Sequence, residues 1–109
     1  MSQVSILKDA DFEREVLQCD CLAVVDFGAA WCGPCKKLHP IIGELAEEFD
    51  RTVKFFEMDV GETPYTAQKY AVISVPQLLF FQNGSVVERI VGLLPKPKIK
   101  EKIEQALKG

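Results

Sequence analysis

An apolar run at residues 22–27 is the feature that most constrains how this chain folds. Apart from Asp26, its residues do not alternate with polar ones, so the run predicts a strand buried on both faces, as in the centre of a sheet. Residues 36–49 follow with apolar side chains at spacings of three and four, which predicts an amphipathic helix that Pro40 is expected to kink. The chain is therefore expected to contain a buried strand that leads into a long helix.

Two cysteines separated by two residues lie between that strand and that helix. The stretch is Trp31-Cys32-Gly33-Pro34-Cys35-Lys36. Because unpaired N–H groups and the dipole at a helix N-terminus favour an anion, Cys32 is expected to form a thiolate, the reactive form of cysteine. Cys35, one turn later, is near enough to attack a mixed disulfide formed at Cys32. Thiol–disulfide chemistry is the leading interpretation; a permanent disulfide and half of a metal site are the alternatives.

Length and composition are those of an ordinary globular chain. Of 109 residues, 48% are hydrophobic and 27% charged, so residues 1–109 are expected to form a single domain with its own core. The net charge of −3 and the lack of a Lys/Arg block argue against a nucleic-acid partner. No apolar run reaches the length of a membrane span. Residues 1–5 lack the basic start and apolar stretch of a signal peptide, which predicts a cytoplasmic protein.

The other two cysteines, Cys19 and Cys21, form a Cys-x-Cys pair rather than a second Cys-x-x-Cys. A zinc site usually needs four ligands and the sequence has one histidine, so no metal site is predicted. A disulfide between residues two apart is expected to be strained, which favours two thiols that are partly buried or on the surface. A regulatory or intermolecular disulfide is the alternative.

The rest of the chain predicts strands and helices in alternation. Further strands are expected at residues 4–7, 53–60, 77–82 and 86–91, and further helices after a cap at Asp9 or Asp11, at residues 65–70 and at the C-terminal end. Asn83-Gly84 is a strong hairpin signal, so the last two strands are expected to be antiparallel, whereas two βα crossovers imply parallel pairing. The order βαβαβαββα predicts an α/β chain with a central mixed five-stranded sheet flanked by four helices.

Four stretches resemble the thioredoxin family in order and spacing, over nearly the whole chain. They are Val25-Asp26-Phe27, Trp31-Cys32-Gly33-Pro34-Cys35-Lys36, Val75-Pro76 and Val91-Gly92. The resemblance implies the thioredoxin fold and a general protein-disulfide reductase, in which Cys32 attacks a substrate disulfide and Cys35 resolves the mixed disulfide. It also implies that Asp26 lies beneath the pair and assists proton transfer to and from Cys35. Burial is expected to raise the pKa of Asp26; a merely structural buried acid is the alternative.

The same resemblance implies a shallow apolar groove for the substrate. The residues that it assigns to the groove are Trp31, Val75, Pro76, Val91 and Gly92, and those that complete the active-site turn are Gly33, Pro34 and Lys36. The Val75–Pro76 bond is expected to be cis, although most bonds before proline are trans. The alternatives are a core position for Trp31 and an ordinary turn for Gly92.

Two departures from the family pattern lie close to this groove. Gly28 stands where the family often has a tryptophan beneath the active-site turn, so looser packing is expected there. Gln77 follows the proline where threonine is usual, which puts the substrate preference in doubt.

Two further residues are candidates for a proton path. Glu57 stands where some family members have a lysine near the buried aspartate. His39, four residues after Cys35, shares a helix face with it. His39, with or without Glu57, is therefore a candidate polar partner for Asp26 in a path to Cys35; an exposed helix histidine is the alternative.

The resemblance also implies the partners. No bound cofactor is expected, because the electrons reside in a redox-active disulfide, Cys32–Cys35. An external donor must regenerate the dithiol, which in the family is a thioredoxin reductase, NADPH-linked or, in some organisms, ferredoxin-linked. The expected substrates are disulfide-containing proteins and the expected state is a monomer. A thioredoxin-fold binding subunit or specificity factor of a larger complex is the alternative function.

Overall fold

The computed structural model describes residues 3–109. The prediction about a signal peptide falls partly outside this range, because it includes Met1 and Ser2. The elements in chain order are β1 (Val4–Ile6), η1 (Asp9–Asp11), η2 (Glu13–Leu17), β2 (Leu22–Gly28), α1 (Gly33–Glu48), β3 (Val53–Asp59), α2 (Pro64–Lys69), β4 (Gln77–Gln82), β5 (Ser85–Val91) and α3 (Lys96–Lys108). The strands form one sheet in the order β1-β3-β2-β4-β5. β3 is parallel to β1 and β2, whereas β4 is antiparallel to β2 and β5. The predicted mixed five-stranded sheet is confirmed.

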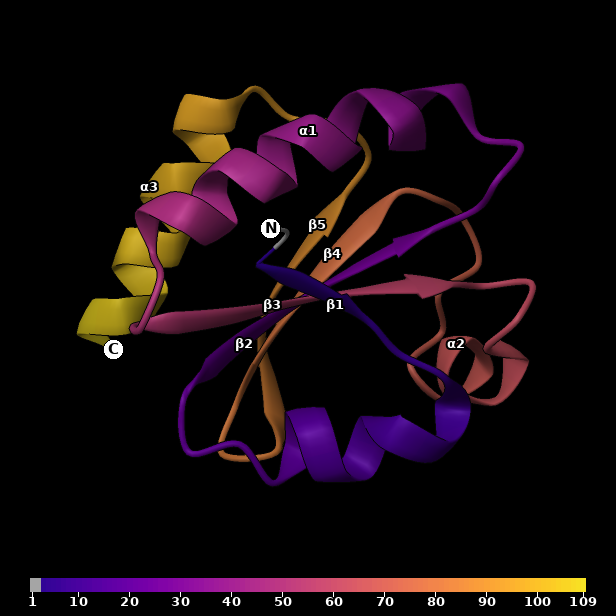
Figure 1. Cartoon of the computed structure of the whole chain (residues 1–109), viewed down its shortest axis with the longest axis horizontal. Helices are drawn as coiled ribbons and strands as arrows, with labels where there is room; N and C mark the ends of the chain where they lie inside the picture. Colours follow the sequence, from indigo (N-terminus) through magenta and orange to yellow (C-terminus); the bar gives the residue numbers. More distant parts are fainter. Residues whose placement is uncertain (1–2) are drawn as a thin grey trace.

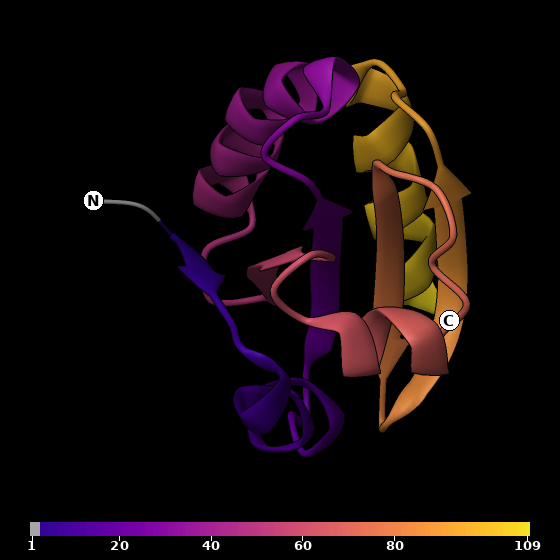
Figure 2. The ribbon, with the colours of Figure 1, turned by 90° about the vertical axis from the view of Figure 1, so that its right-hand side faces the viewer.

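Helices cover both faces of the sheet (Figures 1 and 2), and each face has its own apolar core. α1 and α3 pack on one face, where Leu22 and Val24 of β2 contribute to the core. η1, η2 and α2 lie on the other face, with Val25 and Phe27 of β2 in the core. Because successive side chains of a strand point to opposite faces, Asp26 belongs to the α1 face. The buried central strand thus carries one carboxylate toward the helix that begins with the cysteine motif.

α1 begins earlier than the sequence pattern indicated. The periodicity predicted residues 36–49, but the helix starts at Gly33 and ends at Glu48, with Cys32 as its N-cap residue. The first turn accepts Pro34 because proline has a suitable φ there and the missing N–H has no partner in a first turn anyway. Apolar periodicity alone set the start three residues late, whereas the expected placement of Cys32 at the helix N-terminus and Cys35 one turn later agrees with the structure. Pro40 lies inside α1, as expected.

The first helical segment is not an α-helix. It is a short 3-10 turn, η1, followed by a π-helical turn, η2. The Asp11 carboxylate accepts a hydrogen bond from the Lys8 backbone N–H at 3.0 Å, so it caps this segment. Asp9 instead accepts hydrogen bonds from the backbone N–H groups of Tyr65 and Thr66, at 3.2 and 3.0 Å, and from the Thr66 hydroxyl at 2.6 Å. Asp9 therefore satisfies the N-terminus of α2, an element more than fifty residues away.

Candidate active site

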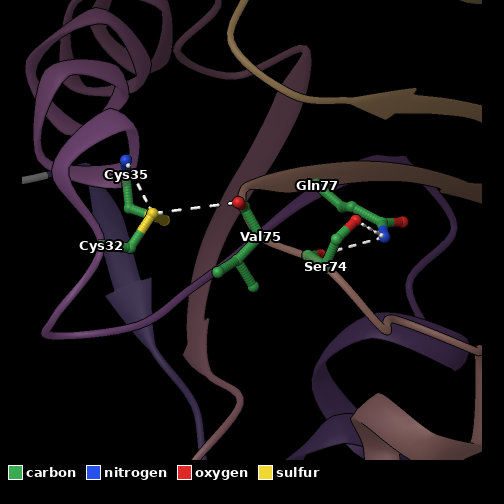
Figure 3. The surroundings of a disulfide bond; sticks show 5 residues. All are labelled: Cys32, Cys35, Ser74, Val75 and Gln77. Atoms are coloured by element: carbon green, nitrogen blue, oxygen red, sulfur yellow. Dashed lines mark hydrogen bonds between the residues drawn. A yellow bond between two sulfur atoms is a disulfide. The ribbon is translucent and has the colours of Figure 1, made fainter.

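Cys32 and Cys35 are joined in a disulfide at the N-terminus of α1, with Cα atoms 5.2 Å apart. The Cys35 backbone N–H donates to Cys32 Sγ at 3.2 Å (Figure 3). This contact is the N-cap hydrogen bond of the helix, with a sulfur in the place of the usual oxygen. Cys32 is 5% exposed and Cys35 is also buried. The helix thus aims a backbone N–H at the sulfur that would carry negative charge after reduction.

The loop before β4 faces this disulfide from the other side. The Val75–Pro76 peptide bond is cis, as expected. The Val75 carbonyl oxygen lies 3.9 Å from Cys32 Sγ (Figure 3). The backbone N–H of Gly92, at the end of β5, donates to the Pro76 carbonyl oxygen at 2.9 Å. Residues from three separate stretches of the chain therefore meet around Cys32.

The surface around these residues is apolar and exposed. Trp31 is 78% exposed, which excludes the alternative of a core tryptophan, and Val91 is 62% exposed. A Cβ built on Gly92 meets nothing within 4 Å, but Gly92 has a φ of +92°, a conformation that favours glycine. Ile73, which lies two residues before Val75, is 94% exposed. The sequence prediction did not include Ile73. An isoleucine near Pro76, in a stretch with no predicted strand or helix to bury it, indicates an exposed apolar side chain.

The buried side chain of Gln77 anchors the loop of residues 70–76, which is called the proline loop below. It is 3% exposed, and its Nε2 donates to the Ser74 carbonyl oxygen at 3.0 Å and contacts the Ser74 hydroxyl at 3.3 Å (Figure 3). Its Oε1 accepts a hydrogen bond from Arg89 Nη1 at 2.7 Å, and Arg89 Nη2 donates to the Tyr70 carbonyl oxygen at 2.6 Å. These bonds tie both ends of the 70–76 loop to β4 and β5. Sequence reasoning did not identify Arg89, which looks like an ordinary charge on an edge strand.

Asp26 lies beneath the disulfide. It is 5% exposed, and its Oδ1 has no hydrogen-bond partner within residues 3–109. Burial raises the pKa of Asp26 to about 7, with a smaller contribution from the nearby Glu57 carboxylate. A cavity of about 410 Å³ borders Asp26 and Cys35, and Gly28 lines it. A Cβ on Gly28 would stand 3.5 Å from Cys35, so the missing side chain keeps this space open, in line with the looser packing expected there.

His39 and Glu57 line the same cavity. His39 Nδ1 lies 3.4 Å from Glu57 Oε2, and the His39 side chain is 60% exposed. Neither residue makes a hydrogen bond to Asp26 Oδ1, since that atom has no partner among the residues that the structure describes. The structure therefore brings His39 to Glu57, and both to the mouth of the cavity above Asp26, without direct contact to the buried oxygen.

The second cysteine pair corrects the expectation of two free thiols. Cys19 and Cys21 form a disulfide, with Cα atoms 5.3 Å apart. An extended chain spaces residues i and i+2 by roughly 6.6 Å. Here the turn after η2 draws the two residues closer, into the range that disulfides span. The prediction failed because spacing along the sequence does not reveal this turn.

Within the described part of the chain, no three His, Cys, Asp or Glu residues are grouped to hold a metal ion. None of the described helices combines the length and apolar character needed to cross a membrane.

Comparison with known proteins agrees with the fold and with the cysteine pair at the N-terminus of α1. The thioredoxin family model matches residues 3–105. The chain is 44% identical over 105 residues to thioredoxin from Haemophilus influenzae, covering 96% of this chain and 98% of the relative. It is 37% identical to the chloroplastic M-type thioredoxin of Pisum sativum and 36% identical to chloroplastic thioredoxin M4 of Arabidopsis thaliana, each over 105 residues and 96% of this chain. It spans 61% and 54% of the length of these two relatives. The chain belongs to the thioredoxin family.

Proposed function

We propose that this chain is a general protein-disulfide reductase in which Cys32 is the attacking thiolate and Cys35 the resolving thiol. The observation that carries the proposal is the position of Cys32. Its sulfur caps α1, accepts the Cys35 N–H at 3.2 Å and faces the Val75 carbonyl oxygen at 3.9 Å. Three features of the fold thus converge on one sulfur: a helix N-terminus, a resolving cysteine and a loop able to align a substrate.

The reaction proceeds in two exchanges. The Cys32 thiolate attacks one sulfur of a substrate disulfide, which forms a mixed disulfide and releases the other substrate sulfur as a thiolate. Cys35 then attacks Cys32 Sγ, which closes the Cys32–Cys35 disulfide and releases the second substrate thiolate. The Cys35 N–H bond and the dipole of α1 favour negative charge on Cys32 in both exchanges. The chain itself supplies both electrons from two thiols, so no bound cofactor takes part.

Asp26 accepts the proton of Cys35 in the second exchange and returns it when the disulfide is reduced. A base with a pKa near the working pH is suited to this role, and the pKa of Asp26 is raised to about 7. Both groups line the same cavity, which is open to solvent. His39 and Glu57, paired at the mouth of that cavity, exchange the proton with water outside.

The substrate lies on the apolar surface around Cys32. Trp31, Val75, Pro76, Val91 and Gly92 form this surface, while Gly33, Pro34 and Lys36 complete the turn that presents the sulfur. The Val75 backbone pairs with an extended segment of the substrate, and the open space above Gly92 admits that segment. The exposure of Trp31 and Val91 supports this arrangement, because exposed apolar surface is typical of a binding site.

Residues 1–109 act as one monomeric domain in the cytoplasm, where the chain contributes to electron transfer and redox homeostasis. The substrates are proteins that carry disulfides, and a thioredoxin reductase, NADPH-linked or ferredoxin-linked, regenerates the dithiol. No nucleic acid takes part. The family resemblance supports these assignments, and the names of the chloroplastic relatives favour neither kind of reductase over the other.

Reduction of insulin disulfides tests the proposal. Full-length chain with NADPH and a thioredoxin reductase is expected to reduce insulin over many turnovers, and Cys32→Ser is expected to abolish the reaction. Cys35→Ser is expected to accumulate a mixed disulfide at Cys32, detectable by mass spectrometry. Failure with both kinds of reductase and with dithiothreitol as donor would contradict the proposal and favour the binding subunit. A Cys32→Ser/Cys35→Ser variant that still performs the protein's role in the cell would also contradict the reductase proposal and favour the binding subunit.

A further inference from the structure

The Cys19–Cys21 disulfide plays no part in the reaction described above. We propose that it is a second redox-active disulfide, and that the Cys32/Cys35 dithiol of another copy of this chain reduces it. The proposal rests on the proposed function for its electron donor. It also goes beyond that function, because it makes the chain a substrate of its own reaction.

The backbone holds the two cysteines close together. The Gln18 N–H donates to the Glu13 carbonyl oxygen at 3.0 Å, which ends η2 with a π-helical turn, and the Cys19 N–H donates to the Val16 carbonyl oxygen at 3.4 Å. Cys21 then leads directly into β2. Because both sides of the turn are anchored, the two sulfurs stay within bonding range after reduction. The pair is therefore able to open and close without rearrangement of the fold.

The disulfide gains little stability from the loop that it closes. In the chain-entropy account, a disulfide stabilises more when it closes a longer loop, and this loop contains one intervening residue, Asp20. Cys19 and Cys21 are both partly exposed, whereas the active-site cysteines are buried. Exposed disulfides with little to stabilise them are the ones that thiols reduce easily. These features distinguish the pair from a structural disulfide.

The hydrogen bonds assign different roles to the two sulfurs. The Cys21 backbone N–H donates to Cys19 Sγ at 3.2 Å, the same distance as from the Cys35 N–H to Cys32 Sγ. A donor at Cys19 Sγ stabilises the thiolate that leaves from this sulfur. Cys21 lines an open cavity of about 370 Å³, through which an incoming thiolate can approach. Cys21 Sγ is therefore the atom attacked, and Cys19 is the leaving group.

The electron donor must be another molecule. The Cys19–Cys21 turn precedes β2 and the Cys32–Cys35 turn follows it, so the two disulfides lie at opposite ends of this strand. A strand of this length spans roughly 20 Å, whereas exchange needs direct contact between sulfurs. The two pairs of one chain therefore cannot react with each other.

The reaction is balanced in thiols and electrons. The Cys32 thiolate of the donor copy attacks Cys21 Sγ of the acceptor copy, which breaks the Cys19–Cys21 bond and releases the Cys19 thiolate. Cys35 of the donor then attacks Cys32 Sγ, which closes the donor disulfide and releases the Cys21 thiolate. Two electrons pass from donor to acceptor. The two protons lost by the donor thiols are taken up by the two acceptor thiolates.

Two complementary full-length variants isolate the two pairs. Cys32→Ser/Cys35→Ser, oxidised with diamide, is the acceptor, and Cys19→Ser/Cys21→Ser, reduced and freed of reductant, is the donor. After mixing, thiols are alkylated with N-ethylmaleimide and located by peptide mass spectrometry. The expected result is two thiols gained at Cys19 and Cys21 for every two lost at Cys32 and Cys35. Insulin reduction by the same donor preparation shows separately whether the proposed function holds.

Two outcomes would overturn the proposal while the donor still reduces insulin. In the first, diamide forms no Cys19–Cys21 disulfide within a single chain. In the second, the disulfide forms and dithiothreitol opens it, but the donor does not. The attacked sulfur is tested separately: a donor that also carries Cys35→Ser is expected to form a mixed disulfide with Cys21, and trapping at Cys19 instead would refute the roles assigned to the two sulfurs.

Discussion

Asp26 and Glu57 are direct neighbours in the parallel register of β2 and β3, so two carboxylates lie side by side beneath the active-site disulfide. Burial is the main cause of the raised pKa of Asp26, and the negative charge of Glu57 adds to it. Since parallel neighbours lie on the same face of a sheet, any change in the charge of Glu57 acts directly on Asp26. Glu57 therefore tunes the group that is proposed to move the proton of Cys35.

Replacement of Glu57 is expected to lower the pKa of Asp26. In Glu57→Gln the repulsion disappears but burial remains, so the pKa should fall below about 7 and stay above the ordinary aspartate value. Glu57→Lys should lower it further, because a cation favours the carboxylate. Carbon NMR of the Asp26 carboxyl group over a pH titration measures both shifts. Glu62→Gln, at an exposed position just after β3, is the matched control and should leave the titration unchanged. A titration of Asp26 that is identical in Glu57→Gln and wild type would contradict the account.

Asp26 is expected to destabilise the oxidised protein as the pH rises. The folded state holds the Asp26 proton up to a pH of about 7, while the unfolded state loses it near 3.8. Asp26 therefore makes its full contribution to the free energy of unfolding below about pH 3.8. This contribution, about 4 kcal/mol in total, is lost as the pH rises to about 7. Asp26→Asn should lack this loss. The difference in unfolding free energy between variant and wild type, measured with urea from pH 3.5 to 8, should grow in favour of the variant up to about pH 7. A constant difference over this range would show that Asp26 is not perturbed.

Removal of His39 is expected to change the pH dependence of disulfide reduction. When protonated, His39 offsets the charge of Glu57, 3.4 Å away, and so limits the effect of Glu57 on Asp26. His39→Ala should therefore shift the acid side of the rate profile to higher pH. Insulin reduction followed from pH 5 to 9 measures the shift, with Lys37→Ala, an exposed position on the same helix, as control. An unchanged profile would remove His39 from the mechanism and leave it an exposed helix residue.

Gln77→Ala is expected to weaken substrate binding more than chemistry. The substitution removes the donor to Ser74 and the acceptor for Arg89, so Ser74 is no longer tied to β4, while the bond from Arg89 to the Tyr70 carbonyl oxygen remains. We expect a several-fold rise in KM for insulin with kcat little changed, and a stability loss of about 1–3 kcal/mol from the unpaired buried groups. Gln82→Ala, at the other end of β4, is the control for the loss of a glutamine from this strand. A fall in kcat at unchanged KM would contradict a positioning role.

Asp9→Ala is expected to destabilise α2 rather than its own segment. The Asp9 carboxylate accepts the first N–H groups of α2 and the Thr66 hydroxyl, and loss of such a cap typically costs about 1 kcal/mol. Hydrogen exchange should show faster exchange in residues 64–70 and little change in residues 9–17. Asp50→Ala, at an exposed position just after α1, should affect neither segment. Faster exchange in residues 9–17 alone would show that Asp9 caps its own helix after all.

The amino-acid sequence by itself determined the central strand, the position of the cysteine motif and the family of this protein. Residues 22–27 are apolar on both faces apart from Asp26, which is typical of a central strand, and the cysteine motif follows the end of that strand. The cis bond before Pro76 and the burial of Asp26 also agree with expectation. The strand, the cysteine motif and the burial of Asp26 follow from patterns visible in one linear stretch, whereas the cis bond was expected from the family resemblance.

Only the tertiary structure decided which distant groups meet. Asp9 caps α2, Gln77 binds Arg89 and Ser74, and His39 pairs with Glu57 rather than with Asp26. Each of these contacts depends on strand register and on the packing of helices against the sheet, which a sequence pattern does not encode locally. The Cys19–Cys21 disulfide has the same origin, because the turn after η2 brings together two residues that an extended chain would hold apart.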